Sequence, residues 1–227
     1  MDTTERSNYL FDLAYRNAMG DATRRTNVEA GSKKIFLDTN KPNSRKAKNL
    51  IREYIDENFK GEHICFYETA SSVVKLLSFI DDKNTFFDFG NAQKLINMTA
   101  KYLFIMLYNS DDIDLRSKFT HFHCPMDRIM INTVTKKYSK YLNSISNAKE
   151  KENKEKNLYI KVAENGKPCK ESTGECSKKW GKVAWSDLNE DTKYVYEKYQ
   201  KMVCILCKEA EKEAIIPLEF DLKYWKP

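Results

Sequence analysis

The most apolar segment of the chain, residues 92–108, constrains the fold more than any other feature. Its apolar residues occupy more than one side of a helix, which is typical of a helix that is buried among others. Its uninterrupted apolar stretch, residues 102–108, is far too short to cross a bilayer. The segment therefore predicts a buried helix at the centre of a helical protein, with no membrane partner.

Apolar residues recur at helical spacing through most of the remaining chain. Further helices are predicted over residues 8–19, 43–59, 63–79 and 189–213, and after Pro125. Asn43 or Ser44 is expected to cap the second of these, and Gly61 to end it. The 227 residues include only 7 glycines and 5 prolines, which favours long regular elements. We expect a mainly α fold, formed by one compact helical domain over residues 1–227.

Several segments interrupt the helical pattern. We expect irregular structure over residues 21–42 and a polar connection over residues 111–116. The run of charges at residues 148–157 predicts a linker or a solvated helix end, where the domain would subdivide if it does. In the C-terminal third, residues 158–162 alternate and residues 167–181 hold turn formers, which predicts a short β-hairpin or extended segment. Residues 217–225 are predicted to form an extended tail with aromatic anchors.

The charge balance permits a nucleic-acid partner. The chain carries 39 lysines and arginines against 33 aspartates and glutamates, a formal net charge of +6. A basic surface can displace the counterions condensed on phosphates, but the same balance arises from solvated lysine-rich helices. The first twelve residues are polar and contain no signal sequence, so we expect a cytoplasmic protein. A protein partner is the other option.

Lys94 stands near the start of the predicted buried helix, after Phe89-Gly90-Asn91-Ala92-Gln93. Desolvation lowers the pKa of a lysine, because burial disfavours the charged form. A lysine amine without its proton is a nucleophile that can form a Schiff base. The alternative is an ordinary lysine whose side chain extends from the helix end to solvent.

Asp127 closes the segment His121-Phe122-His123-Cys124-Pro125-Met126-Asp127, just before another predicted helix. An aspartate in this position is ordinarily an N-cap. Held near a lysine, its carboxylate would instead stabilise a cation developing at a sugar carbon, or assist proton transfer.

Together these two segments resemble the catalytic region of helix-hairpin-helix DNA glycosylases, particularly the archaeal 8-oxoguanine branch, over about residues 89–134. In that family a lysine at the start of a helix attacks the sugar C1′, and an aspartate two residues after a proline completes the site. The matching positions here are Lys94 and Asp127. Gly90 alone represents the glycine pattern through which the family's hairpin grips phosphate, which is a departure from that pattern.

The resemblance implies a DNA base-excision glycosylase/lyase that flips a damaged or modified base into a pocket. Lys94 and Asp127 would be catalytic, and Gly90, Gln93 and His123 would contact the substrate. The resemblance implies no cofactor. The competing hypothesis is a non-catalytic helical module that binds protein or nucleic acid, of the kind used in host–parasite conflict. It predicts that Lys94 points to solvent and that Asp127 is only a cap.

Metal binding is the weaker alternative. Cysteines of an intracellular chain are expected to be thiols or metal ligands. Four of them would make a structural zinc site: Cys169, Cys176, Cys204 and Cys207. The competing interpretation is that they pack as small apolar residues. A second cluster would combine His121, His123 and Cys124 with His63 and Cys65. Motifs of conventional nucleotide hydrolases, serine hydrolases and helical metalloproteases are absent from the sequence.

Overall fold

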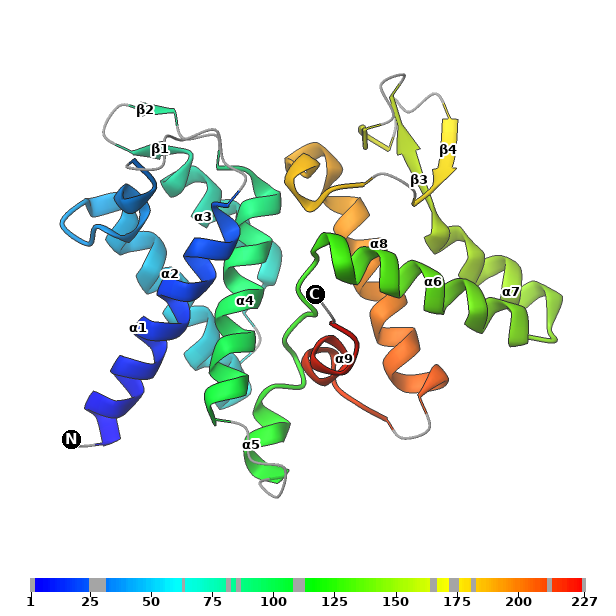
Figure 1. The fold of residues 1–227 in the computed structure, drawn as a ribbon, viewed down its shortest axis with the longest axis horizontal. Helices are drawn as coiled ribbons and strands as arrows, with labels where there is room; N and C mark the ends of the chain where they lie inside the picture. The colour runs from blue at the N-terminus through cyan, green and yellow to red at the C-terminus, as the bar shows by residue number, and fades with distance from the viewer. Residues whose placement is uncertain are drawn as a thin grey trace. The chain divides into compact units, whose positions relative to one another are not determined.

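The computed structural model describes residues 3–24, 32–62, 64–80, 83–84, 87–107, 113–163, 167–171, 176–180, 183–211 and 214–225. Over these residues the protein is mainly α-helical, as predicted (Figure 1). The chain divides into two compact units, Met1–Phe122 (unit 1) and His123–Pro227 (unit 2). The predicted subdivision at residues 148–157 lies inside unit 2, and the single domain stays a prediction.

Unit 1 is built around α4 (Phe89–Leu107), the predicted buried helix, which packs against α1 and α3. Residues 89–101 of this helix are all buried. The other elements of unit 1 are α1 (Thr3–Ala22), the 3₁₀-helix η1 (Ser32–Leu37), α2 (Pro42–Lys60), α3 (Phe66–Leu77), β1 (Phe79–Ile80), β2 (Lys83–Asn84) and α5 (Ile113–Lys118). β1 and β2 form a minimal antiparallel pair.

Local sequence defines the C-terminal end of α2, and tertiary contacts hold its N-terminal end. Gly61 ends the helix as predicted, in the left-handed region at φ 86°, with its N–H 3.2 Å from the Asn58 carbonyl. The predicted cap at the other end is wrong, because α2 begins at Pro42 without a side-chain cap. Asn43 donates instead to the Phe79 carbonyl and Ser44 to the Ile35 carbonyl, so both side chains fasten α2 to its neighbours.

Aromatic rings pack together where α2 and α4 meet the segment that follows α5. Phe119 packs edge-to-face against Phe59 and Phe104, with ring centroids 4.8 Å and 5.0 Å apart. Phe122 meets Tyr54 and Phe59 in the same geometry. Pairs of this kind contribute about 0.5–1.5 kcal/mol each beyond the area they bury. They fix the segment that follows α5 onto α2.

Unit 2 joins a set of helices to the predicted short hairpin. β3 (Tyr159–Val162) pairs antiparallel with β4 (Cys176–Lys179), so that Tyr159 lies opposite Lys179. The helical elements are α6 (Arg128–Ser144), α7 (Ala148–Glu155), η2 (Lys156–Leu158), η3 (Trp185–Asp187), η4 (Glu190–Thr192), α8 (Lys193–Ile205), the π-helical segment η5 (Leu206–Ala210) and α9 (Pro217–Tyr224). α8 packs against α6, α9 and η2.

Helix α8 holds the irregular segment that leads into α6. The Tyr199 hydroxyl donates to the Pro125 carbonyl at 3.0 Å, and Gln200 Nε2 donates to the Cys124 carbonyl at 2.7 Å. His123 Nδ1 lies 2.9 Å from the Tyr196 hydroxyl. The bonds to Pro125 and Cys124 satisfy backbone acceptors that have no helical partner, and the three contacts together hold this segment against α8.

Three predictions for irregular segments are wrong. Residues 217–225 form the helix α9 rather than an extended tail, with Pro217 in its first turn and the Ile216 N–H bonded to the Glu219 carboxylate at 3.0 Å. α5 begins at Ile113 inside the predicted connection, and η1 occupies part of the segment expected to be irregular. Pro217 at the start of α9 and Glu219 two residues later together form a local helix-start signal.

The long helix predicted over residues 189–213 is in fact subdivided. Asn189 caps η4 with its side chain, α8 begins only at Lys193, and the chain adopts π geometry from Leu206. The charged run at residues 148–157 is largely the helix α7, which has no buried residue, as expected for a solvated helix. Among the helices of the described residues, none combines the length and the apolar character needed to span a membrane.

Candidate functional site

Lys94 lies in the second turn of α4, and only 9% of its surface is exposed. The non-catalytic hypothesis expects Lys94 to point to solvent, and the burial of this lysine differs from that expectation. Its neighbour Gln93 is fully buried and uses its polar atoms inside the helix. Gln93 Nε2 donates to the Gly90 carbonyl at 3.1 Å, and Gln93 Oε1 accepts from Asn97 Nδ2 at 3.4 Å. Gly90 is itself part of the first turn of α4.

Asp127 is the N-cap of α6, and both of its carboxylate oxygens are engaged. Oδ1 accepts the Met130 backbone N–H at 2.9 Å, which satisfies one of the free donors of the first helical turn. Oδ2 accepts the indole N–H of Trp225 at 3.0 Å, across 98 residues of sequence. The carboxylate thus fastens the end of the chain to the start of α6. Asp127 is therefore the N-cap that the sequence suggested, and its bond to Trp225 is a contact that the sequence did not predict.

The residues proposed from the resemblance are divided between the two units. Gly90, Gln93 and Lys94 belong to unit 1, and His123 and Asp127 belong to unit 2. Their assembly into one site remains a prediction. Desolvation lowers the pKa of His123 to about 4, so the imidazole beside Tyr196 is neutral at pH 7.

The cysteines proposed for zinc are only partly described. The side chain of Cys176 and the whole of His63 lie outside the described residues. Among the described residues, no three histidines, cysteines or acids gather as metal ligands would. Burial raises the pKa of the Cys207 thiol to about 12. Cys124, from the second proposed cluster, is buried with its Sγ 3.2 Å from the Tyr199 hydroxyl.

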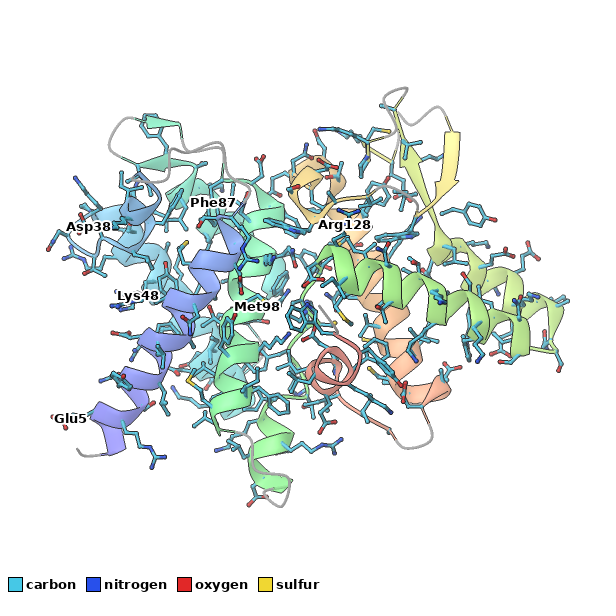
Figure 2. All side chains as sticks on the ribbon, in the orientation of Figure 1. Glu5, Asp38, Lys48, Phe87, Met98 and Arg128 are labelled. Carbon is cyan, nitrogen blue, oxygen red and sulfur yellow. The ribbon has the colours of Figure 1, made fainter. Side chains whose placement is uncertain are left out.

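The exposed side of α6 forms a basic surface that sequence reasoning missed. We define the α6 basic face by four exposed residues, Arg128, Asn132, Lys136 and Lys140. The opposite side of the helix is buried through Met130, Ile131, Val134, Tyr138 and Leu142. The 3.6-residue period separates the two sets, and α6 contains no aspartate or glutamate. Figure 2 labels Arg128 at the start of the helix.

The cations of the α6 basic face are not neutralised by acids on the elements packed against α6. Glu150 and Glu209 pair with Lys154, at 2.9 Å and 2.5 Å, and Glu211 pairs with Lys223 at 2.6 Å. Within the part of the chain that the structure describes, Arg128, Lys136 and Lys140 make no ion pair. The charges of Arg128, Lys136 and Lys140 are therefore presented to solvent, whereas Lys137 lies over the Tyr224 ring, 3.6 Å from its centroid.

Net charge is also uneven between the units. Unit 2 holds 21 lysines and arginines against 16 aspartates and glutamates, and unit 1 holds 18 against 17. The signal that could have revealed the α6 basic face is local. Residues 128–144 contain four cations and no acid, whereas the charged run of α7 alternates in sign.

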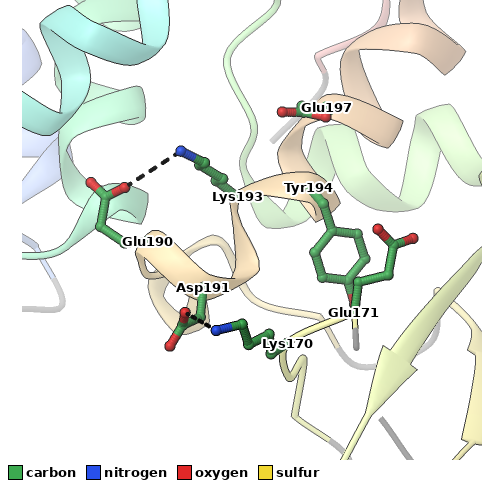
Figure 3. Close-up of a pocket in the computed structure, with 7 residues that line it drawn as sticks. All are labelled: Lys170, Glu171, Glu190, Asp191, Lys193, Tyr194 and Glu197. Carbon is green, nitrogen blue, oxygen red and sulfur yellow. Dashed lines mark ion pairs between the residues drawn. The ribbon is translucent and has the colours of Figure 1, made fainter. Parts of the chain in front are cut away.

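Unit 2 also contains an open hollow of about 490 Å³ beside the start of α8 (Figure 3). It is lined by Lys170, Glu171, Glu190, Asp191, Lys193, Tyr194 and Glu197. Its lysines lie beside its own acids, Lys170 at 3.6 Å from Asp191 and Lys193 at 3.9 Å from Glu190. The hollow therefore has mixed and mutually screened charge, unlike the α6 basic face.

Comparison of the chain with protein-family models, with curated proteins and with solved structures finds no match.

Proposed function

We propose that this protein is a helical nucleic-acid-binding module that contacts phosphates through the α6 basic face. The observation that carries the proposal is the exposure of Arg128, Lys136 and Lys140 on one acid-free helix, without an ion pair to any described residue. Such cations are free to replace the counterions condensed on a nucleic acid, and the released ions drive binding.

The spacing of the cations suits a polyanion. At a rise of about 1.5 Å per residue, Arg128 and Lys140 are about 18 Å apart along the helix axis, and Lys136 and Lys140 about 6 Å. Several phosphates of one nucleic-acid strand fall within that length. The buried side of α6 is anchored by the core of unit 2, so the face is presented on a rigid element.

The test is the salt dependence of binding. Fluorescence anisotropy would measure the affinity of the protein for two labelled DNA ligands, a 20-nucleotide single strand and a 20-base-pair duplex, over a series of salt concentrations. The variant carries Arg128→Gln, Lys136→Gln and Lys140→Gln. For duplex DNA each phosphate contact contributes about 0.9 to the slope of log K against log salt, so we expect the slope to shrink by about 2.7.

The matched control removes the same charge from unit 1, at the exposed residues Arg45, Lys46 and Lys75. We expect the control to bind as the native protein does, with both variants retaining the native circular dichroism. The proposal fails if the native protein shows no salt-dependent binding to either DNA. It also fails if the control variant loses as much DNA affinity and salt slope as the α6 variant.

A second candidate is the glycosylase/lyase activity, and the burial of Lys94 is the observation that favours it. The amine would attack the sugar C1′, the base would leave with the bonding electrons, and the ring would open to a Schiff base that borohydride reduces. Asp127 would favour the cationic transition state through its charge.

Borohydride trapping tests this candidate with duplexes that carry 8-oxoguanine, uracil or an abasic site. We expect an adduct with the native protein and with Lys101→Gln, a control lysine that is also buried in α4, and none with Lys94→Gln. Absence of an adduct with every duplex would refute the activity and leave the binding module standing.

A further inference from the structure

The exposed side of α6 carries amides among its cations and no aromatic ring. Its exposed residues are Arg128, Asn132, Lys136, Lys140, Asn143 and Ser144. Tyr138 is buried, and the Tyr141 hydroxyl is held by Lys154 and Glu209. Proteins that bind single strands stack bases on aromatic side chains, and none of the exposed residues of α6 itself is aromatic, although the exposed ring of Trp225 lies at its N-cap.

We infer that the ligand of the α6 basic face is double-stranded DNA, with α6 lying in the major groove and Asn132 facing the base edges. The inference rests on the proposed function. A helix with its side chains is about 10–12 Å wide, which matches the groove of about 12 Å. The major groove of A-form RNA is too deep and narrow for side chains to read, so duplex RNA fits less well.

Asn132 is the residue suited to reading sequence. An asparagine amide donates and accepts at once, and it matches the N7 and N6 groups that adenine presents in the major groove. Asn132 lies one turn before Lys136, and its side chain has no hydrogen-bond partner among the described residues. Lys136 and Lys140 then reach the flanking phosphates, which position the helix without reading sequence.

The experiment compares four labelled 20-mers of one sequence: duplex DNA, duplex RNA and each single strand. Anisotropy over a series of salt concentrations measures the native protein and the variants Asn132→Ala and Asn143→Ala. Asn143 is an exposed asparagine about 16 Å further along the same helix, which makes it the matched control. A second series compares A·T-containing duplexes with duplexes of G·C pairs alone.

We expect duplex DNA to bind about tenfold or more tightly than the other three ligands. Asn132→Ala should reduce the discrimination between A·T-containing and G·C duplexes by about fivefold or more, with an unchanged salt slope, and Asn143→Ala should not. Equal binding to single strands or to duplex RNA overturns the inference and leaves the proposed function intact. Unchanged discrimination in Asn132→Ala refutes the reading role, and failure to bind any of the four ligands refutes both proposals.

Discussion

The carboxylate of Asp127 gives the sharpest test of the structure, because its two oxygens serve two different elements. The perturbations are Asp127→Ala, Asp127→Asn and Trp225→Phe, with the double variant Asp127→Ala/Trp225→Phe. Loss of an N-cap costs about 1 kcal/mol. A hydrogen bond to a charged group contributes about 1.5–3 kcal/mol, and we take the lower end because Trp225 is 38% exposed.

These values predict a pattern across the four variants. Asp127→Ala should lower the free energy of unfolding of unit 2 by about 2–3 kcal/mol, since both bonds are lost. Asp127→Asn keeps one acceptor oxygen for the cap, so it should resemble Trp225→Phe at about 1–1.5 kcal/mol. The double variant should match Asp127→Ala alone, so the coupling free energy should equal the cost of Trp225→Phe, about 1–1.5 kcal/mol.

Denaturant unfolding followed by circular dichroism measures all four variants without relying on tryptophan fluorescence. Additive losses in the double variant would refute the bond between Asp127 and Trp225. An Asp127→Asn protein that keeps its cap but loses every borohydride adduct would show that the negative charge of the carboxylate also acts in catalysis. The same set of proteins therefore separates the structural role from the catalytic one.

Two further predictions concern a pair of glycines and a histidine. Gly20→Ala in α1 should stabilise unit 1 by about 0.5–1 kcal/mol, and Gly61→Ala, at φ 86°, should destabilise it by about 1 kcal/mol. An added Cβ meets no atom within 4 Å at either position, so thermal unfolding of the two variants reports backbone preference alone. Equal shifts of the melting temperature in the two variants would refute this prediction. The pKa of His123 falls from 6.5 to about 4 on folding, so below pH 6.5 the unfolded chain binds the proton more readily. Unit 2 should keep its full stability above about pH 6.5 and lose at most about 3 kcal/mol as the pH falls to 4, and denaturant titrations of His123→Gln should lack this component.

Much of the fold follows from interactions that reach only a few residues along the chain. The apolar periodicity of residues 92–108 predicts the buried helix α4, and the glycine at position 61 predicts the end of α2. Pro125 and Asp127 predict the start of α6, because a cap and its helix are neighbours in sequence. The start of α9 carries the same kind of local signal, at Pro217 and Glu219. The sequence therefore contains the information that predicts this helix, although residues 217–225 were expected to be extended.

The remaining features depend on which elements lie side by side. Asn43 and Ser44 look like caps in the sequence, but their side chains bind the backbone of β1 and η1. The bond between Trp225 and Asp127 joins residues almost a hundred positions apart, and no local rule predicts such a contact.

The sequence by itself determined that this protein is mainly helical, that α4 is buried, that α2 ends at Gly61 and that Asp127 caps α6. Only the tertiary structure decided that Lys94 is buried, and that Glu150, Glu209 and Glu211 form ion pairs with Lys154 and Lys223. The physical reason is that capping and periodicity act over one or two helical turns. Burial and charge compensation, by contrast, are set by the neighbours that folding brings to each side chain.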